Sequence, residues 1–441
     1  MASTAPEVQD SVLNHSPEFR SRRLQNWLVL GLTYAAMYMA RYNFGFANKA
    51  LSDTYGFTKT QIGTVITAST LIYGLSAIFN GPIADRIGGR RAMLIGACGS
   101  AIFNLAFGLG GYLGFLGTGT VLLAYFATTW SLNMYFQSYS ALALIKVNSG
   151  WFHVTERGRF SAIFGSMIQS GRAAVYALMT SALVVGLDWQ WKFFLPAIVV
   201  TLFTGLTFLY VQDSPKDAGL NDFDPQDATS GDTETVNLAY VAKKVFTNPV
   251  AITIAVAEFC TGLVRKGFEE WFPRYMQEVH HLELDSPIFK KNALAIVGAG
   301  IAGAFTAGYA SDVLFNHRRP PVAFIGYVMQ VCALAVVSWA PSTDAVVFAF
   351  ILNSFAISMV HSMLSGTASM DFGGKRAAAT AAGMFDGMQY VGGSVMGVGA
   401  GWLLDTYGWG AWGPSMIGFS AMGALLMLPL WNARAKRGGG H

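Results

Sequence analysis

Long apolar stretches alternate with short polar ones along almost the whole chain. Twelve of them are about 20 residues long or more, the length that an α-helix needs to cross a bilayer. They lie at residues 26–49, 61–82, 91–113, 118–146, 158–186, 191–211, 248–272, 292–313, 320–340, 344–370, 376–403 and 410–432. The pattern predicts an all-α polytopic membrane protein with twelve transmembrane helices.

One polar interval differs from the other loops. Residues 212–247 separate the sixth and seventh apolar stretches and are rich in Asp, with Gly and Pro, a composition typical of a linker. The predicted organisation is a polar N-terminal segment (1–25), a six-helix bundle (26–211), the linker (212–247), a second six-helix bundle (248–432) and a short tail (433–441).

Composition narrows the class of protein. Charged residues make up 12% of the 441 residues and hydrophobic residues 53%, whereas a soluble domain is about 25% charged. We therefore expect lipid around most of the surface, and the formal net charge of +4 gives no reason to expect a nucleic-acid partner. The sequence has no cysteine spacing of the metal-binding kind, no phosphate-binding loop and no catalytic triad. We expect no metal, no cofactor and no enzymatic activity.

The placement of lysine and arginine predicts the orientation of the chain. If the termini and the loops that follow even-numbered helices face one side, that side holds nineteen of the 29 Lys and Arg residues, and the other side holds six. Cytoplasmic segments carry the basic excess, so both termini are expected in the cytoplasm. Four basic residues fall inside the predicted helices instead: Arg41, Arg172, Arg265 and Lys266.

Two of these cations lie deep in the predicted membrane. Arg41 is about 15 residues into helix 1 and Arg265 about 17 residues into helix 7, near the bilayer centre at ~1.5 Å per residue. A charge there costs at least ~2.5–3.5 kcal/mol, so it faces a cavity or a partner. A guanidinium fork suits an oxyanion, and two arginines from two bundles repel each other unless an anion lies between them. We predict that both bind substrate; internal ion pairs are the alternative.

Tyrosines surround the helix 1 arginine. Tyr34 and Tyr38 share the helical face of Arg41, and Tyr42 follows it. A tyrosine hydroxyl can donate to a phosphate oxygen while the ring walls a pocket. These tyrosines are therefore predicted to bind substrate, with core packing as the alternative.

Helix 7 carries carboxylates beside its cations. Glu258, Arg265 and Glu269 fall on one helical face. Glu269 has three interpretations: a gating partner of Arg265, a carboxylate at the far end of the helix, or a proton-coupling site. Lys266 is expected to pair with Glu270 rather than to bind a ligand.

Helices 5 and 11 occupy equivalent places in the two halves. Arg172 in helix 5 is predicted either to touch the substrate or to pair with Asp386 in helix 11. Asp386 could instead recognise a cationic group of the substrate. His361 and Gln137 are interpreted as helix–helix hydrogen-bonding residues.

A weak internal repeat supports two equivalent halves. Residues 81–91 (GPIADRIGGRR) and 308–319 (GYASDVLFNHRR) both give Gly-x-x-x-Asp followed by basic residues. Asp85 and Asp312 are 227 positions apart, and Arg41 and Arg265 are 224 apart. An Asp at a helix end can bind the N-terminus of a neighbouring helix. Asp85 and Asp312, with Arg86 and Arg90, are therefore predicted to form a latch that holds the cytoplasmic face closed in one conformation of the protein. The alternative is that these charges only set the orientation of the chain in the membrane.

The first copy of this motif, GxxxDRxGxR, resembles the major facilitator superfamily, which implies a fold of two six-helix pseudo-repeats. A narrower set of stretches is similar to the organophosphate:phosphate antiporter family, which includes glycerol-3-phosphate and hexose-6-phosphate transporters. These are YAAMYMARYNF (34–44), DSPKDAGL (213–220), the arginine of LVRKGFEEWFPRYMQEV (263–279) and KRAAATAAGMFDGMQYVGGSV (375–395).

This resemblance implies that Arg41 and Arg265 grip a phosphate, one from each half, and that Tyr34, Tyr38, Tyr73 and Tyr390 line the cavity. It also implies exchange of an organic phosphate for inorganic phosphate by alternating access. The chain departs from the family pattern at four places. Other members have a basic residue after the helix 1 arginine, where this chain has Tyr42, and a lysine in helix 2, where it has Ala77. They also have a histidine in helix 5, where this chain has Ile168 and Gln169, and a Gly-Trp-Pro-Pro-Cys pattern in helix 4, where it has SYSALAL (138–144).

The resulting hypothesis is a monomeric inner-membrane transporter of a small phosphorylated or otherwise anionic metabolite, exchanged for inorganic phosphate. One alternative is proton-coupled transport of a zwitterion or another organic anion, such as a phosphonate or an amino-bearing phosphate. A transporter-like sensor is a second alternative, and a structural protein is a third.

Overall fold

The computed structural model describes residues 15–113, 119–152, 169–221, 247, 249–316, 318–339 and 342–432. All regular secondary structure in these ranges is helical. The first 14 residues, most of the predicted linker (222–246), the tail from 433 and the start of predicted helix 5 (158–168) lie outside the described residues.

The first half contains one helix or helical pair for each of its predicted spans. In order these are α2 (Pro17–Tyr55), α3 (Lys59–Ile87), α4 (Gly89–Leu109) with the short η1 (Gly110–Tyr112), α5 (Thr120–Gln137), α6 (Tyr139–Trp151), a helical stretch at 169–179, α8 (Ala182–Val185) and α9 (Trp191–Tyr210), followed by the short η3 (Lys216–Ala218).

The second half follows the same plan. Its elements are α11 (Pro249–Glu278), α12 (Pro287–Tyr309), the π-turn η4 (Ala310–Leu314), α13 (Arg319–Trp339), α14 (Thr343–His361), the π-turn η5 (Ser362–Thr367), α15 (Ala368–Tyr407), η6 (Trp409–Ala411) and α16 (Trp412–Met427). Each predicted apolar stretch overlaps a helix.

Several helix ends differ from the predicted ones. α2 starts at Pro17, ahead of the apolar stretch, because the Ser16 side chain accepts a hydrogen bond from the Phe19 N–H and Pro17 occupies the first turn. The predicted fourth span divides at Ser138 into α5 and α6. Hydropathy predicts where an apolar stretch lies, whereas capping side chains and interruptions of the helical hydrogen bonding determine the residues at which a helix begins and ends.

Five helical segments in the described part of the chain are long and apolar enough to cross a membrane by composition alone. They are Gly89–Tyr112, Trp191–Tyr210, Pro287–Tyr309, Arg319–Trp339 and Thr343–Ser365. By contrast, α2, α11 and α15 carry charged side chains that are buried or half-buried in the protein. Intramembrane charges face the interior of a bundle rather than lipid, so these three helices mark the polar interior.

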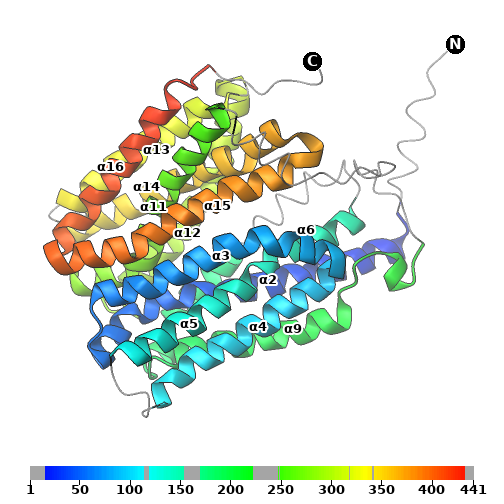
Figure 1. Cartoon of the computed structure of the whole chain (residues 1–441), viewed down its shortest axis with the longest axis horizontal. Coiled ribbons are helices and arrows are strands. Elements are labelled where there is room, and N and C mark those ends of the chain that lie inside the picture. The colour runs from blue at the N-terminus through cyan, green and yellow to red at the C-terminus, as the bar shows by residue number, and fades with distance from the viewer. Residues whose placement is uncertain are drawn as a thin grey trace.

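The two sets of helices form two bundles that lie side by side, with α3 and α15 along the seam between them (Figure 1). At Gly63 of α3 the backbone of Gly397 in α15 approaches so closely that a Cβ atom would clash. The Thr67 hydroxyl donates to the Ser394 carbonyl, 2.5 Å away. Small residues permit this approach, as at other helix pairs in membranes.

The bundles are also tied together where α2 and α11 end. The Arg274 guanidinium donates to the side chains of Asn48 and Ser52, each at 2.8 Å. The Asp405 carboxylate accepts hydrogen bonds from the backbone N–H groups of Lys59 and Thr60 at the start of α3, at 3.0 and 2.7 Å. A carboxylate at a helix N-terminus is favourable, so this end of the interface is closed by polar contacts.

Candidate functional site

Arg41 lies near the middle of α2 with only 4% of its surface exposed. Its Nε and Nη2 atoms donate to Oε1 of Gln137, at 3.1 and 3.0 Å, and Nη2 donates to the Ser140 hydroxyl at 3.1 Å. The guanidinium also lies over the rings of Tyr38 and Tyr73, 4.9 and 4.8 Å from their centroids. All these partners are neutral. Within the described residues, no carboxylate pairs with Arg41.

Gln137, the last residue of α5, holds this guanidinium in place. Its Nε2 donates to the Met37 carbonyl at 2.9 Å and to the Ser100 hydroxyl at 2.7 Å, so its oxygen is directed at Arg41. The sequence analysis interpreted Gln137 only as a helix–helix hydrogen-bonding residue. Its role in orienting Arg41 was missed, although an amide within an apolar helix was the available signal.

The predicted tyrosines form two groups. Tyr34, Tyr38 and Tyr42 stack along α2, with ring centroids 5.2 and 5.4 Å apart. Tyr73 of α3 packs against Tyr390 of α15, with centroids 4.4 Å apart. Because this second pair crosses the seam, the aromatic wall over Arg41 is built from both halves.

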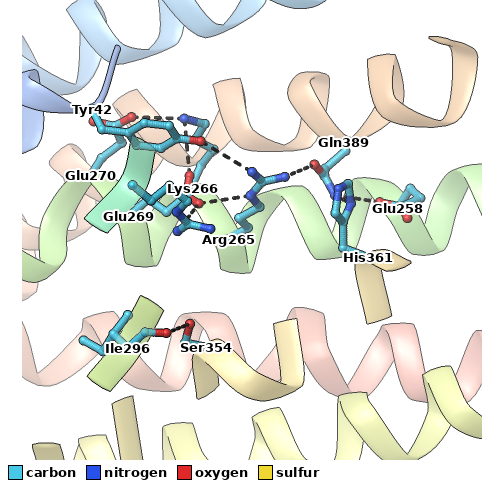
Figure 2. A network of polar contacts seen from close by, with 11 residues as sticks. Tyr42, Glu258, Arg265, Lys266, Glu269, Glu270, Ile296, Ser354, His361 and Gln389 are labelled. Carbon is cyan, nitrogen blue, oxygen red and sulfur yellow. Dashed lines mark hydrogen bonds and ion pairs between the residues drawn. The ribbon is translucent and has the colours of Figure 1, made fainter. Parts of the chain in front are cut away.

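Arg265 of α11 has a different environment. Its Nε donates to the Glu269 carboxylate at 3.1 Å, its Nη1 to Oε1 of Gln389 at 2.8 Å, and its Nη2 to the Tyr42 hydroxyl at 3.4 Å (Figure 2). The predicted Arg265–Glu269 pair is therefore confirmed as a contact. Tyr42 brings α2 of the first half to this arginine of the second half.

Arg172 also binds Glu269, with Nη2 at 2.9 Å from Oε1. The predicted Arg172–Asp386 pair was wrong. The position of Arg172 within the fifth apolar stretch indicated a buried cation, but the packing of the 169–179 helix directs it to Glu269 of α11; its other predicted role, contact with the substrate, stays a prediction. Asp386 of α15 is half-buried and lies within electrostatic reach of both Arg265 and Arg41.

Lys266 completes the cluster on α11. Its Nζ lies 3.2 Å from Oε1 of Glu270 and 3.5 Å from Oε2 of Glu269, and 5.2 Å from the centroid of the Tyr42 ring. The predicted Lys266–Glu270 pair is confirmed as a contact. The same lysine also touches the carboxylate that both arginines share.

Glu258, fully buried on α11, lies deeper along the same side of the site. One of its oxygens accepts a hydrogen bond from Nε2 of Gln389 at 2.8 Å, and that nitrogen also lies 2.8 Å from Nδ1 of His361 (Figure 2). Because Oε1 of Gln389 faces Arg265, its amide links Glu258 to that arginine. Sequence reasoning did not select Gln389.

Two cavities lie beside the cluster. One of about 10 Å³ is lined by Tyr42, Phe46, Arg172, Val175, Tyr176 and Glu269; this volume suits about one water molecule. A larger one of about 300 Å³ is lined by Tyr176, Ala177, Thr180, Ser181, Lys290 and Leu294, between the 169–179 region and α12. Tyr176 borders both.

The structure does not test the predicted latch at its two aspartates. The side chains of Asp85 and Asp312 lie outside the described ones, and Arg86 is exposed. The carboxylate that binds the N-terminus of α4 is Asp213, which accepts a hydrogen bond from the Arg90 N–H at 2.6 Å.

The Arg90 side chain supports the same local contact. It donates to the Phe208 carbonyl at 2.5 Å and lies over the Phe208 ring, all within the first half. Burial raises the pKa of the Asp213 carboxyl, and the hydrogen bond from Arg90 offsets part of that rise. Gly88 has a φ of +88°, and a side chain there would collide with Asp213, so the turn requires glycine.

Three named bacterial proteins align with nearly the whole chain. The glycerol-3-phosphate transporter of Bacillus subtilis (strain 168) is 28% identical over 425 residues, which cover 94% of this chain and 93% of that protein. The membrane sensor protein UhpC of Escherichia coli (strain K12) is 27% identical over 432 residues, covering 95% and 94%. A probable hexose phosphate transport protein of Chlamydia trachomatis serovar D is 24% identical over 447 residues, covering 94% and 92%.

Solved structures share the fold at low sequence identity. A bacterial homolog of the human lysosomal transporter Spinster superposes with a TM-score of 0.70 at 14% identity, over 95% of both chains. The nucleoside transporter NupG gives a TM-score of 0.69 at 12% identity, over 93% of this chain and 99% of its own. Residues 30–397 match the Major Facilitator Superfamily. With its two bundles of helices, the chain therefore belongs to the Major Facilitator Superfamily.

Proposed function

We propose that this protein is a secondary transporter that carries a small phosphorylated organic anion across the inner membrane in exchange for inorganic phosphate. The observation that carries the proposal is Arg41, a buried guanidinium held only by neutral groups. No carboxylate of the described residues forms an ion pair with Arg41, although Asp386 lies within electrostatic reach of it, and a buried charge without such a pair is costly. An oxyanion at this position would supply the missing charge.

The surroundings of Arg41 suit a phosphate. Gln137 fixes the plane of the guanidinium, so its fork is already oriented for a second partner. The rings of Tyr38 and Tyr73 exclude water from the same atoms, which strengthens a charge-assisted hydrogen bond. Arg265 and Tyr390 would close the pocket from the second half.

The relatives support the same class of substrate. Two of the three relatives described above carry the names of glycerol-3-phosphate and hexose phosphate transporters. The excess of Lys and Arg on one side of the predicted topology supports cytoplasmic termini. The tied ends of α2 and α11 would then lie on the outer side, and alternating access would require those ties to open. We propose that the protein works as a monomer.

Exchange of labelled phosphate by the full-length protein in proteoliposomes preloaded with unlabelled phosphate tests this function. Uptake is expected for the native chain and is expected to vanish in Arg41→Ala and Arg265→Ala. Lys192→Met is the matched control: Lys192 is another buried cation of the first half, but its Nζ binds the Phe46 carbonyl, at 2.9 Å. Exchange that persists in Arg41→Ala would contradict the proposal.

A sensor is the second candidate, favoured by the similarity to UhpC. A sensor would bind the phosphorylated ligand without moving it across the bilayer. Phosphate binding by the purified chain, together with no exchange in vesicles, would therefore favour a sensor. Uptake driven by a pH gradient, with no phosphate exchange, would instead favour the proton-coupled transport of a zwitterion or another anion.

A further inference from the structure

We propose that Glu269 is an internal anion that occupies the cations of the second half when no substrate is bound, and that a substrate phosphate displaces it. This inference rests on the proposed function and adds a mechanism for it. It assigns Glu269 a positioning role in substrate binding: the carboxylate holds the arginines in place and competes with the ligand for them.

Three cations converge on this one carboxylate. Arg172 donates to Oε1 of Glu269 at 2.9 Å. Arg265 donates to the same oxygen at 3.1 Å, and Nζ of Lys266 lies 3.5 Å from Oε2 (Figure 2). Glu269 is 8% exposed, so water screens these interactions weakly. Two guanidinium groups that share a single oxygen have donors left for a larger anion, because a phosphate offers more oxygens than a carboxylate.

The shared carboxylate joins the two halves of the protein. Arg172 comes from the 169–179 helix of the first bundle, whereas Glu269 and Arg265 come from α11 of the second. A phosphate that replaced Glu269 between the two arginines would keep the cross-bundle bridge but transfer it from the protein to the substrate. The closure of the interface would then depend on whether substrate is bound.

Displacement would not leave Glu269 without a counter-ion. Lys266 lies three residues before Glu269 on the same helix and already touches its second oxygen. This lysine can remain with Glu269 while the arginines bind the phosphate. Lys266 also pairs with Glu270, so one lysine would then be shared by two carboxylates, and this incomplete neutralisation favours return of the arginines to Glu269 when the phosphate leaves.

The cavities support a role for this pair in access to the site. Arg172 and Glu269 both line the cavity of about 10 Å³, and Tyr176 separates it from the cavity of about 300 Å³. Separation of the Arg172–Glu269 pair would widen the small cavity beside Tyr42, whose hydroxyl contacts Arg265.

The test is a calorimetric titration of the purified full-length protein with inorganic phosphate. Glu269→Gln keeps the shape of the side chain but removes the competing charge, and we expect its Kd for phosphate to fall about tenfold, since the apparent affinity rises with the fraction of molecules whose site is free. Phosphate exchange should slow in the same variant because the substrate is released less readily.

Glu270→Gln is the matched control. Glu270 is the adjacent residue, has the same chemistry and similar burial, and pairs with Lys266 but not with either arginine. Its Kd for phosphate should stay within about twofold of the native value, the variation expected for a group that does not touch the ligand-binding cations. Glu269→Asp, which keeps the charge, should also bind phosphate with nearly native affinity.

The possible outcomes separate the two proposals. If the native chain neither binds nor exchanges phosphate, the proposed function fails, and this inference fails with it. If the native chain exchanges phosphate but Glu269→Gln binds it with equal or lower affinity, only the inference is overturned. Should Glu269→Gln fail to fold, the double variant Glu269→Gln/Arg172→Gln removes both charges of the bridge, and it must bind phosphate more tightly than Arg172→Gln alone.

Discussion

Arg41 and Arg265 are the same residue type at matching depths in the two halves, yet their surroundings differ in kind. Arg41 is held by an amide, a hydroxyl and two aromatic rings. Arg265 is held by a carboxylate that it shares with Arg172 and Lys266. The first arginine has no ion-pair partner among the described residues, and the second shares one carboxylate of the protein with two other cations.

The difference suggests a division of labour between the halves. A guanidinium with only neutral partners gains most of its stabilisation from an incoming anion, so Arg41 would supply affinity. A guanidinium that must exchange the Glu269 carboxylate for a ligand gains less binding free energy from that ligand. Because this exchange also breaks a contact within the protein, Arg265 would link substrate binding to the movement of the bundles. Similar residues in a repeated fold therefore need not have similar energetic roles.

The largest expected effect comes from conservative substitution of the two arginines. Arg41→Lys loses the fork held by Gln137, and phosphate should bind about 100-fold more weakly, because a charge-assisted hydrogen bond contributes roughly 1.5–3 kcal/mol. Arg265→Lys should weaken binding only about tenfold, since the lost contacts are partly offset by release from Glu269. Titration with phosphate measures both, and equal losses would remove the proposed distinction.

A substitution at Gln137 would give Arg41 an anionic partner like the one that Arg265 has. Gln137→Glu places a carboxylate on Arg41, and phosphate should bind about tenfold more weakly, because ligand and protein then compete for one guanidinium. The Ser100 hydroxyl can rotate to donate to the new carboxylate, whereas the Met37 carbonyl loses its donor, so the thermal midpoint of this variant must be measured beside its Kd. Gln137→Met, which removes the amide without adding a charge, is the control. The comparison fails if both variants weaken binding equally.

A smaller effect is expected from Tyr42→Phe. The tyrosine hydroxyl is 3.4 Å from Nη2 of Arg265, a long hydrogen bond, and the ring that lies near Lys266 and Arg172 is kept. Phosphate affinity should fall about two- to fivefold, consistent with a weak neutral hydrogen bond of ~0.5–1 kcal/mol. Tyr38→Leu, which removes a ring from Arg41, should have the larger effect. A reversed order in the titrations would argue against Arg41 as the stronger site.

The smallest effect on binding is expected at Asp213, far from both arginines in sequence. Asp213→Ala removes the acceptor for the Arg90 N–H at the start of α4, which should cost about 1 kcal/mol of stability, the usual value of a helix cap. A lower thermal midpoint with unchanged phosphate affinity is expected. A large change in Kd would show that a loss of stability alone can weaken phosphate binding, and the arginine variants would then no longer identify the binding site.

The same residue gives a pH dependence with a defined sign. Because burial raises the pKa of Asp213 in the folded protein, the folded state takes up its proton at a higher pH than the unfolded state does. The contribution of Asp213 to stability should therefore rise as the pH falls through the raised pKa. Thermal midpoints of the native chain and Asp213→Ala should converge as the pH rises through the raised pKa of Asp213 and keep a constant difference above it; a constant difference at acidic pH as well would contradict this expectation.

Sequence reasoning found most members of the site but few of the contacts between them. Arg41, Arg172 and Arg265 stood out because a charge inside an apolar stretch needs a cavity or a partner. The Arg265–Glu269 and Lys266–Glu270 pairs followed from helical spacing, since both partners lie on α11. The partner of Arg172 was predicted wrongly, because it lies on another helix and no periodicity along one helix specifies it.

Gln137 and Gln389 show the limit most clearly. Each is an uncharged residue in an apolar stretch, and each directs its amide oxygen at one of the two arginines. A neutral amide costs much less to bury than a charge, so its presence in a membrane helix demands less explanation from the sequence alone. Only packing shows that these amides orient the cations.

The sequence by itself determined the number of apolar spans, the polar interval that divides them and the positions at which charge enters the membrane, because hydrophobic length and the cost of a buried charge act along the chain. Tertiary structure alone decided which charges from different helices meet. It left Arg41 with neutral partners and gathered three cations around Glu269, because contacts between helices depend on how two bundles pack, and the order of residues in one helix does not encode its neighbour.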